Sequence, residues 1–595
     1  MSAPFLTYKT YLKSRHGEPL FRVPIDFNSG CPHRNADGSG GCTFCAERGA
    51  RAVQTQDVNS VEDQIKTAIK FARNRYRAKK YMAYIQAFSA SFGPARQKEY
   101  LQLFNSFNFS AISFGTRPDS LTPQAYTFLE KLNQTTETWV ELGVQTVHDK
   151  TLKRINRCHD WNASKTAIKE LHKRGIRVAV HIILALPGET SADFKQTAET
   201  LATLPIDAIK IHNLHIEKGT QLAKEYAQNP FPLLMEHDFA EEVIAFIRRI
   251  PAHIPIMRLT TDTLATELIA PKWQMDKNQF KDYLIQQMIC REYQQGDLCK
   301  TQTPTPNPSS IYKILITEDQ SVTFWNPDYK EHYHTPAGAR LEAEQKYISP
   351  SHLDHLLDTT SNLHLLDICF GLGYNSLCAL NHALKKERAT LHITALEMDR
   401  RVVKHAAQNI TTQTSDPFDW KNTLTNLYQH QQQKIQNHTL KIHWGDARHT
   451  ITKQKPNQFD LVFLDAFSTQ RNSELWTVEF FKKIKSLMKP NALLLTYCAA
   501  IPVRAGLLEA GFFVGETKPV GRNRGGTLAT QNPDLIAIPL NPNEQKTIQT
   551  TTRGIPYHDP FSVWTNKEIL RHRQNQILKT KASFSSTDCA DKHRF

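Results

Sequence analysis

The sequence lacks any uninterrupted apolar run of the length that spans a membrane, which takes about 20 residues. The first residues, Met1 to Lys9, also lack the apolar core of a secretory signal. We therefore expect a cytoplasmic protein with no membrane partner. Only ten of the 595 residues are cysteine, and their distribution is not that of a disulfide framework. This too favours a reducing compartment.

Acidic side chains are in deficit. The chain has 58 Asp and Glu residues against 73 Lys and Arg residues, a formal net charge of +15. Lysine and arginine release condensed counterions when they meet phosphates, so this excess favours a polyanionic partner. Charge alone does not distinguish nucleic acid from an anionic surface. A basic enzyme without such a partner is also compatible with it.

The length allows roughly two to four domains. A stretch rich in proline and short polar residues, 301–310, predicts a linker between a first domain, 1–300, and a second, 311–565. On either side of the linker, strand-like apolar runs alternate with amphipathic helices. This alternation is typical of α/β folds.

Two segments of the second half look unlike core. Thr411 to His438 is rich in Gln, Asn and Thr, and we expect a polar insertion there. The last segment, 566–595, is predicted to form a basic helix followed by a disordered tail from about Lys579, where Ser and Lys residues recur.

The first half contains several strand candidates separated by helical stretches. The strand candidates are 81–86, 111–115, 138–143, 177–183 and 208–212. Such a succession predicts a barrel or partial barrel of parallel strands, with the chemistry at the carboxyl ends of the strands.

Cys31, Cys42 and Cys45 are the most informative residues of the chain. Ten residues separate the first two cysteines, and two residues separate the second from the third. Three thiolates leave one iron of a four-iron cluster without a protein ligand, so that this iron can bind another molecule. The alternative is a structural zinc site with His33 as the fourth ligand, because closed zinc sites usually need four nitrogen or sulfur ligands.

Together with the cysteines, several blocks of residues 1–300 resemble the radical SAM family of YhcC and YtqA. These blocks are 8–12, 86–88, 115–119, 139–146, 148–152, 183–189 and 210–212. The resemblance implies a [4Fe–4S] cluster on Cys31, Cys42 and Cys45, whose open iron binds the amino and carboxylate groups of S-adenosylmethionine (SAM). One electron from the cluster then yields a 5′-deoxyadenosyl radical. A one-electron donor such as flavodoxin or ferredoxin is implied as a partner.

The resemblance also suggests which polar residues contact the cofactor. Gln86, just after a strand, would bind the SAM amino group, although a polar strand-end residue that bonds only to backbone is an equal alternative. Glu141 is expected to end a strand and to contact the SAM amine or ribose. Cys158 stands where family members usually have glycine, and we interpret it as tolerated variation. Candidates for the substrate mouth are Lys9, Lys13, Arg117, His181, Lys210, His212 and His215.

In the second half, four motifs follow one another in the order that a class I methyltransferase has. Asp367, Gly371, Gly373 and Asn375 lie in a turn between a predicted strand and helix, where backbone amides approach a ligand closely. Such a turn alone is also compatible with a dinucleotide site. The other three motifs are Glu397, expected to accept from both ribose hydroxyls, Asp446, expected at the adenine amino group, and the strand 459–467. All four together predict a second SAM site in a Rossmann-like domain.

Further segments resemble the methyltransferase domain of the MnmC family over residues 311–565. They are 333–334, 337–344, 465–468, 472–477 and 521–524. That family methylates the amine of 5-aminomethyl-(2-thio)uridine at the wobble position of tRNA. The flavin-dependent oxidase that MnmC carries after its methyltransferase has no counterpart motif here.

The resemblance and the chemistry of amines together point to Asp465. A protonated amine cannot attack a sulfonium methyl group, and a carboxylate can hold the amine and help it lose a proton. We expect Asp465 in this catalytic role, with Trp476 or Phe467 near the uracil. The alternative is that Asp465 only shapes the pocket. Candidate phosphate contacts are Arg471, Arg504, Arg522 and Arg524.

The two resemblances combine into one functional prediction. The radical SAM half would convert 5-carboxymethylaminomethyl-(2-thio)uridine of tRNA to 5-aminomethyl-(2-thio)uridine, in place of the missing oxidase. The methyltransferase half would then form 5-methylaminomethyl-(2-thio)uridine. The alternatives are a radical SAM half with a different tRNA reaction, such as thiolation, and a tRNA-binding scaffold with degenerate sites.

Overall fold

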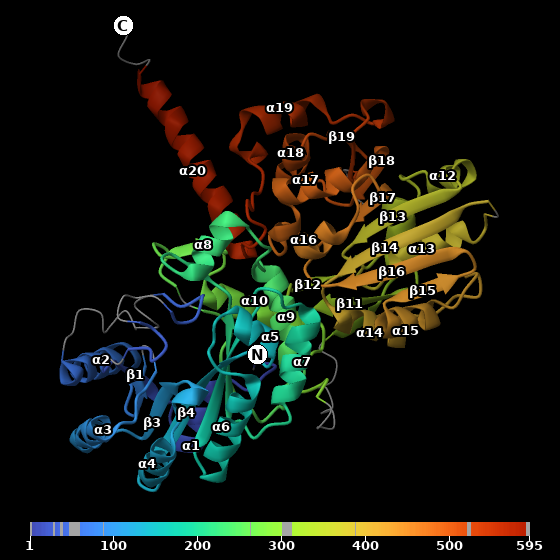
Figure 1. Cartoon of the computed structure of the whole chain (residues 1–595). Helices are drawn as coiled ribbons and strands as arrows, with labels where there is room; N and C mark the ends of the chain where they lie inside the picture. Colours follow the sequence, from blue (N-terminus) through green and yellow to red (C-terminus); the bar gives the residue numbers. More distant parts are fainter. Residues whose placement is uncertain are drawn as a thin grey trace. The chain divides into compact units, whose positions relative to one another are not determined.

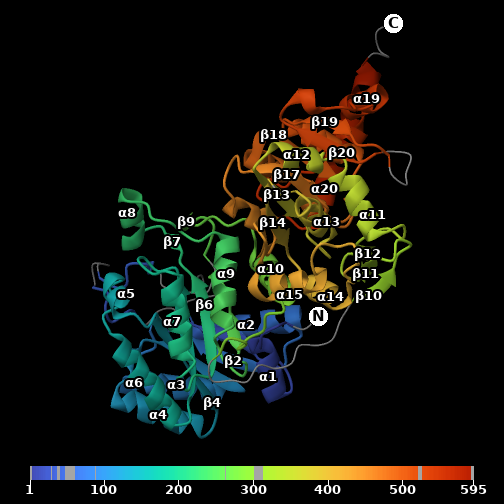
Figure 2. The ribbon, with the colours of Figure 1, turned by 90° about the vertical axis from the view of Figure 1, so that its right-hand side faces the viewer.

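The computed structural model describes residues 3–27, 30–35, 40–46, 60–86, 89–261, 263–299, 312–386, 388–519 and 525–590, with backbone alone for 582–590. The chain divides into two compact units (Figure 1, Figure 2). The first unit is Met1–Ile289 with Tyr293–Pro306, and the second is Cys290–Glu292 with Asn307–Phe595. The linker predicted at 301–310 lies outside the described residues.

The first unit is built on a seven-stranded sheet of order β1-β2-β3-β4-β5-β6-β8, in which every neighbouring pair is parallel. The strands are β1 (Phe21–Ile25), β2 (Tyr81–Ile85), β3 (Ala111–Thr116), β4 (Glu137–Gln145), β5 (Arg177–Leu184), β6 (Ala208–Asn213) and β8 (Ile256–Arg258), and a small second sheet pairs β7 (Ile216–Glu217) with β9 (Leu268–Ala270). This confirms the predicted partial barrel of parallel strands.

Helices separate most of the strands along the chain (Figure 1). They are α2 (Val61–Tyr76), α3 (Pro94–Ser106), α4 (Pro123–Asn133), α5 (Asp149–Arg154), α6 (Trp161–Lys173), α7 (Ser191–Leu201), α8 (Gln221–Gln228), α9 (Glu236–Ile247) and α10 (Lys277–Cys290). Helix α6 illustrates why these segments form helices. Its buried residues are Ser164, Ala167, Ile168 and Leu171, a helical spacing that gives one apolar face, and the Asp160 side chain caps its first turn.

The first helix of the chain, α1 (Tyr8–His16), covers the amino ends of the strands. Its buried residues Tyr8 and Leu12 share a core cluster with Ala111, Ala208 and Trp139, which stand at or near the start of β3, β6 and β4. The opposite, carboxyl edge of the sheet therefore remains for the chemistry.

The second unit has an eight-stranded sheet of order β15-β16-β14-β13-β17-β18-β20-β19. Its strands are β13 (Asn362–Ile368), β14 (Thr390–Glu397), β15 (Gln432–Ile435), β16 (His438–Trp444), β17 (Phe459–Leu464), β18 (Met488–Thr496), β19 (Phe513–Glu516) and β20 (Thr527–Thr530). The central strands are parallel, and β15, β20 and β19 run antiparallel to their neighbours. A smaller sheet of β10 (Lys313–Ile316), β11 (Val322–Asn326) and β12 (Glu331–His332) precedes it in sequence.

Helices cover both faces of this sheet, so side chains on both faces of β13 are buried. Leu363 and Leu365 belong to one core cluster, and Leu366 and Ile368 to the other. The first cluster includes residues of α11 (Ala339–Ala343), α12 (Leu353–Thr359), α13 (Tyr374–Ala383), α14 (Arg400–Asn409) and α15 (Trp420–His430). The second includes residues of α16 (Ala447–Thr450), α17 (Val478–Leu487), α18 (Ile501–Glu509) and α20 (Asn566–Ala590). This confirms the Rossmann-like α/β fold.

Two predictions about polar segments are wrong. Thr411 to His438 is not a polar insertion, because it forms α15 and β15, and Trp420, Leu424 and Leu427 of α15 lie in the core. Its apolar residues are few but recur at helical spacing, and a prediction from composition alone does not detect such a spacing. The chain end is helical to Ala590, beyond Lys579, where we expected disorder. No helix among the described residues is long and apolar enough to cross a membrane.

Candidate functional sites

The three cysteines lie in the loop that follows β1, at the carboxyl edge of the first sheet. The loop turns back on itself, with the Cys45 amide bonded to the Cys42 carbonyl at 3.1 Å. Residues 155–156 clamp it, because the Thr43 amide donates to the Ile155 carbonyl at 3.0 Å and the Asn156 side chain donates to the Gly41 carbonyl at 2.7 Å. Burial, and then the neighbouring Cys42, raise the pKa of Cys45 to about 11.

Two arginines donate to the sulfur of Cys42. The guanidinium Nη1 atoms of Arg117 and Arg157 lie 3.8 and 3.3 Å from it, and their residues are only 4% and 6% exposed. Asp119 pairs with Arg117 at 2.9 Å, which leaves an excess of positive charge beside the thiol. Hydrogen-bond donors and positive charge beside a cysteine sulfur suit a thiolate bound to iron, so the donor set fits the implied [4Fe–4S] cluster.

A mononuclear zinc site has less support. His33, the fourth ligand in that alternative, hydrogen-bonds through Nε2 to Asp119 at 2.7 Å. Cys158 is exposed and has φ +62°, a conformation that glycine adopts most readily. This accounts for the glycine that relatives are expected to carry there.

Glu141 does not end a strand, as the sequence suggested; β4 continues to Gln145. Its carboxylate is 1% exposed and already accepts from Ser113 Oγ at 2.8 Å, His181 Nε2 at 2.8 Å and Lys210 Nζ at 3.2 Å, and it forms an ion pair with Arg22. Burial alone would raise the pKa of Glu141, but Arg22 and Lys210 hold it well below its ordinary value. Glu141 therefore organises the barrel interior.

Gln86 directly follows β2, and its backbone amide donates to the Ile25 carbonyl at 3.1 Å. This places it at the carboxyl edge of the sheet, beside the end of the strand that leads into the cysteine loop. Its contact with the SAM amino group stays a prediction.

The candidates for the substrate mouth separate into two groups. The His181 and His212 rings lie 5.5 Å apart, and Lys210 bonds to the same carboxylate as His181. His215 follows β6 and bonds to Thr263 at 2.8 Å. Lys9 and Lys13, in contrast, are exposed on α1 at the amino ends of the strands. Their prediction as mouth residues is wrong, because a sequence does not show at which end of a barrel its first helix packs.

In the second unit, the predicted Gly-rich turn joins β13 to α13. Gly371 has φ +56° and Gly373 has φ +91°. A Cβ atom on Gly373 would stand 2.6 Å from the ring of Phe370. Asp367 accepts from Ser376 Oγ at 2.6 Å, and burial raises its pKa to about 7. Only glycine suits this turn, which therefore has the form that the sequence predicts.

Glu397 stands at the end of β14, next to this turn. It accepts from the Gly371 amide at 2.8 Å and from the Asp399 amide at 2.7 Å, and burial raises its pKa to about 7. Asp446 caps α16 and forms an ion pair with Arg448 at 2.8 Å. Part of its capacity to accept hydrogen bonds is thus already used within the protein.

Asp465 directly follows β17 and accepts from Asn375 Nδ2 at 2.9 Å. Burial raises the pKa of its carboxyl group to about 6. This bond joins positions 90 apart in the sequence and links the predicted catalytic carboxylate to the Gly-rich turn. Asp465 is also a neighbour that raises the pKa of Asp367. Several carboxyl groups therefore meet here, an arrangement that suits a cationic ligand such as the sulfonium of SAM.

Aromatic side chains lie next to this group. Phe467 stacks on Tyr329 with ring centroids 4.4 Å apart and lies 5.0 Å from Tyr333. The Tyr333 ring also comes within 3.3 Å of where a Cβ on Gly371 would be. Tyr329 was missed by the sequence analysis, and no local pattern marks it. Trp476, in contrast, is fully buried and donates to the Phe467 carbonyl at 2.8 Å, so it cannot contact a base.

Among the candidate phosphate contacts, Arg504 is wrong. It is 0% exposed and pairs with Glu544 at 2.8 Å and Glu516 at 2.6 Å. Arg471 is exposed, as a phosphate contact requires. Arg522 and Arg524 lie outside the described residues.

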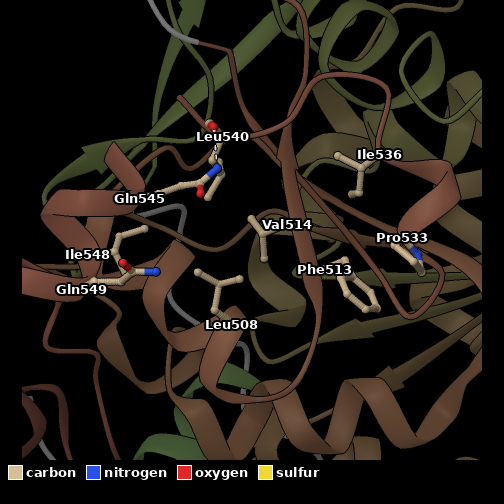
Figure 3. Close-up of a pocket in the computed structure, with 9 residues that line it drawn as sticks. All are labelled: Leu508, Phe513, Val514, Pro533, Ile536, Leu540, Gln545, Ile548 and Gln549. Atoms are coloured by element: carbon tan, nitrogen blue, oxygen red, sulfur yellow. Dashed lines mark hydrogen bonds between the residues drawn. The ribbon is translucent and has the colours of Figure 1, made fainter. Parts of the chain in front are cut away.

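A cavity of about 330 Å³ lies elsewhere in the second unit (Figure 3). It is lined by Leu508, Phe513, Val514, Pro533, Ile536, Leu540, Gln545, Ile548 and Gln549. Phe513 and Val514 belong to β19, the edge strand, whereas the predicted SAM motifs follow the central strands β13, β14 and β17. This cavity carries no titratable side chain and is not the predicted cofactor site.

Comparison with protein families finds three matched regions. Residues 25–201 match the radical SAM superfamily and residues 206–289 match a radical SAM C-terminal domain. Residues 408–532 match a family of S-adenosyl-L-methionine-dependent methyltransferases.

Similar proteins divide between the two halves. The protein YtqA of Bacillus subtilis is 34% identical over 277 residues, which are 46% of this chain and 85% of YtqA. A bifunctional MnmC protein of Dichelobacter nodosus is 25% identical over 203 residues, 32% of each chain. The crystal structure of MNMC2 from Aquifex aeolicus is 26% identical, with a TM-score of 0.39 over 51% of this chain and 93% of that one. The chain thus spans about a third of the MnmC protein it matches.

These matches imply a [4Fe–4S] cluster with SAM in the first half and a second SAM site in the second half. The described geometry agrees with both, in the guanidinium pair at Cys42 and in the Gly-rich turn after β13. The chain belongs to the radical SAM superfamily as a relative of YtqA and YhcC, and it is an enzyme that also carries an MnmC-like SAM-dependent methyltransferase domain.

Proposed function

We propose that the chain is a bifunctional enzyme that modifies the wobble uridine of tRNA. The observation that carries the proposal is that one chain joins a radical SAM half to a methyltransferase half similar to MnmC. The D. nodosus relative is named a tRNA 5-methylaminomethyl-2-thiouridine biosynthesis bifunctional protein. The net charge of +15 is consistent with tRNA as the polyanionic partner.

The methyltransferase half would methylate 5-aminomethyl-(2-thio)uridine to 5-methylaminomethyl-(2-thio)uridine. With a pKa of about 6, Asp465 is ionised at neutral pH and can hold the substrate ammonium and accept its proton. Asp367, Gly371, Gly373, Asn375, Glu397 and Asp446 would bind the methyl donor. The Tyr329–Phe467 pair offers an aromatic surface to the uracil.

The radical SAM half would convert 5-carboxymethylaminomethyl-(2-thio)uridine to 5-aminomethyl-(2-thio)uridine. When bound to Cys31, Cys42 and Cys45, the cluster supplies the electron that turns SAM into a hydrogen-abstracting radical. Gln86 would orient the SAM amino group, and the barrel interior would place the substrate and exclude water. A hydrogen atom would be taken from the carboxymethyl carbon, and the resulting carbon radical would lose one further electron, which the oxidised cluster could accept, and a proton to become an imine. Addition of water would then break the C–N bond and release the two carbons as glyoxylate, leaving the amine. A flavodoxin or ferredoxin is the proposed electron donor.

Mass spectrometry of tRNA nucleosides tests the proposal. In a strain that lacks the gene, tRNA should accumulate the carboxymethylaminomethyl form of the wobble uridine. In the deletion strain, a Cys31→Ala protein should leave that form unchanged, whereas an Asp465→Ala protein should accumulate the aminomethyl form. The reverse pattern would overturn the assignment of the two steps, and an unchanged wobble uridine in the deletion strain would overturn the proposal itself.

Anaerobic turnover of purified protein tests the radical step directly. With carboxymethylaminomethyl-tRNA, SAM and a reductant, we expect 5′-deoxyadenosine and the aminomethyl nucleoside to appear together. An added thiol group on the uridine, or a methyl group on carbon, would instead favour a different radical reaction.

A further inference from the structure

The interior of the half-barrel holds more positive than negative charge. Among the described residues, Arg22 on β1, Lys210 on β6 and Arg258 on β8 face the same interior as one carboxylate, Glu141. We call these three basic residues the cationic layer. Lys210 lies beside Arg258 in the β6–β8 register, and Arg22 stacks on the Tyr84 ring at 3.7 Å. The layer therefore spans the sheet from its first strand to its last.

The single carboxylate satisfies only part of the cationic layer. Glu141 pairs with Arg22 and with Lys210 Nζ, the latter at 3.2 Å. Lys210 Nζ also donates to Tyr84 OH at 3.2 Å, so one of its three N–H groups remains. Arg258 forms no hydrogen bond or ion pair with any residue that the structure describes. Cations in an interior are stable only when paired, so the described residues supply too little negative charge for the cationic layer.

His212 lies on the same strand as Lys210, nearer the carboxyl edge of the sheet. Its Nε2 is buried and without a partner among the described residues, while Nδ1 lies 3.1 Å from Thr261 Oγ1. Thr261 uses its only hydroxyl proton to donate to the Asn213 carbonyl at 3.0 Å. Thr261 Oγ1 must therefore accept from Nδ1–H of His212. Because burial and nearby cations hold the pKa of His212 well below its ordinary value, the ring is neutral, and Nε2 is left as an acceptor.

The interior of the half-barrel thus has an anion receptor and, next to it on β6, a buried acceptor for an N–H group. Lys210 and His212 are two residues apart on one strand and so lie on one face. An amine and a carboxylate separated by one carbon is the pattern of an N-substituted glycine. Since His212 is nearer the carboxyl edge, the nitrogen would face the mouth and the carboxylate would lie deeper.

We propose that Arg258, Lys210 and His212 form a subsite for an N-substituted glycine group, with its carboxylate on Arg258 and Lys210 and its N–H on His212 Nε2. The inference rests on the proposed function for the identity of the bearer, because the carboxymethylaminomethyl group of the wobble uridine is such a glycine. Its methylene, from which the hydrogen would be taken, is then held between the two contacts. The uridine remains outside the barrel, on the side of the nitrogen.

Two anticodon stem-loops separate recognition of the carboxylate from general binding. One carries 5-carboxymethylaminomethyluridine, and the other carries the neutral carboxamide in place of its carboxylate. We expect the reconstituted full-length protein to bind the carboxylate form more tightly, by about tenfold or more. Arg258→Gln should remove this preference and leave the affinity for the carboxamide unchanged. Arg249→Gln, whose side chain pairs with Glu199 on the helices outside the barrel, is the matched control.

His212→Phe tests the second contact. It should weaken both stem-loops equally and keep the preference for the carboxylate, because it removes only the acceptor of the N–H group. Thermal unfolding of each variant alongside the wild type shows whether a loss reflects misfolding. For a variant that unfolds early, Arg258→Met and His212→Leu replace the first pair, since they too remove the cation and the acceptor.

SAM also carries an amine and a carboxylate, so its binding is measured separately. Equal SAM affinity in the wild type and in Arg258→Gln assigns the subsite to the nucleoside, and a loss of SAM affinity would assign it to the cofactor and overturn the proposal. No preference for the carboxylate in the wild type would also overturn it. A preference that depends on Arg258, without conversion of the nucleoside, would keep the subsite and refute the proposed radical reaction.

Discussion

Two buried guanidinium groups, those of Arg117 and Arg157, touch the sulfur of Cys42. Both are held in place by backbone oxygens. Arg117 donates to the Arg157 carbonyl, and Arg157 donates to the Gly143 carbonyl. A Cβ atom on Gly143 would lie 2.5 Å from Arg157 Nη2, so this glycine makes room for the arginine. Hydrogen bonds and positive charge at a cluster sulfur stabilise the more negative, reduced cluster and raise its reduction potential.

Arg157→Gln should therefore lower the midpoint potential of the cluster. The measurement is a redox titration followed by electron paramagnetic resonance, on anaerobically reconstituted protein of matched iron content. Arg154→Gln is the control, because Arg154 is on the same turn but pairs with Glu225 at 2.6 Å on the surface. Gly143→Ala should shift the potential in the same direction by displacing Arg157. A potential unchanged in both variants would show that the guanidinium pair does not tune the cluster.

At Asp465 the direction of the pH effect follows from its pKa of about 6. Burial raises this pKa above its unfolded value, so the folded state binds the proton more tightly, and this group's contribution to stability is lost as pH rises through about 6. The methyl transfer needs the opposite, ionised form. We expect the single-turnover methylation rate to rise with pH through about 6 and then level off.

Asp465→Asn should reduce that rate by about 10²- to 10⁴-fold and abolish the rise near its pKa. The melting temperature of Asp465→Asn should also depend less on pH than that of the wild type. A variant that keeps the wild-type rate profile would show that Asp465 only shapes the pocket. Formation of 5′-deoxyadenosine by the first half serves as the internal control, since the substitution lies in the other unit.

At the scale of elements, Arg504 shows how a basic residue can belong to packing. It lies on α18 and joins β19 and α19 (Pro542–Thr550) through Glu516 and Glu544, and its Nε donates to Thr527 Oγ1 at 3.0 Å. The buried charge is fully paired. Removing the guanidinium leaves two carboxylates that lack their partner.

Arg504→Ala should lower the free energy of unfolding of the second unit by about 3–5 kcal/mol. Urea denaturation of the full chain, followed by the fluorescence of the second unit's buried tryptophans, measures this. Arg471→Ala should leave stability unchanged, since Arg471 is exposed, and weaken tRNA binding slightly, with a smaller salt dependence. Equal stability of the two variants would contradict the packing role of Arg504.

Across the whole molecule, the two chemistries occupy separate compact units. The proposed intermediate, the aminomethyl nucleoside, leaves the first site on a tRNA and must reach the second. The residues assigned to each proposed reaction all lie in one unit. The proposed order of reactions therefore requires only that the same tRNA visits both sites.

A mixture of the Cys31→Ala and Asp465→Ala proteins should complete the conversion that neither completes alone. The first variant keeps the methyltransferase site, and the second keeps the radical SAM site. Nucleoside analysis over time should show the aminomethyl form rising and then falling. If the mixture stops at the aminomethyl form, the intermediate is not released, and the two steps depend on a single chain.

Part of this protein could be read from local sequence. The cysteine spacing, the Gly-rich turn and the acidic residues after strands are short patterns of neighbouring residues, and they predicted both cofactors. The alternation of apolar runs with amphipathic helices predicted the α/β order of elements. The turn after β13 keeps its form because Gly373 has φ +91°, which its own residue type allows. Composition failed where spacing mattered, as in α15, whose few apolar residues still form one buried face.

Only the tertiary structure decided which distant residues meet. Arg157 reaches Cys42 across 115 positions of sequence, Asn375 reaches Asp465 across 90, and Arg504 turned out to be buried. The cationic layer arises because parallel strands bring Arg22, Lys210 and Arg258 to one interior. Such contacts depend on strand register and packing, which a short stretch of sequence does not determine. Burial and local charge depend on residues that are distant in the sequence and meet only in the folded protein.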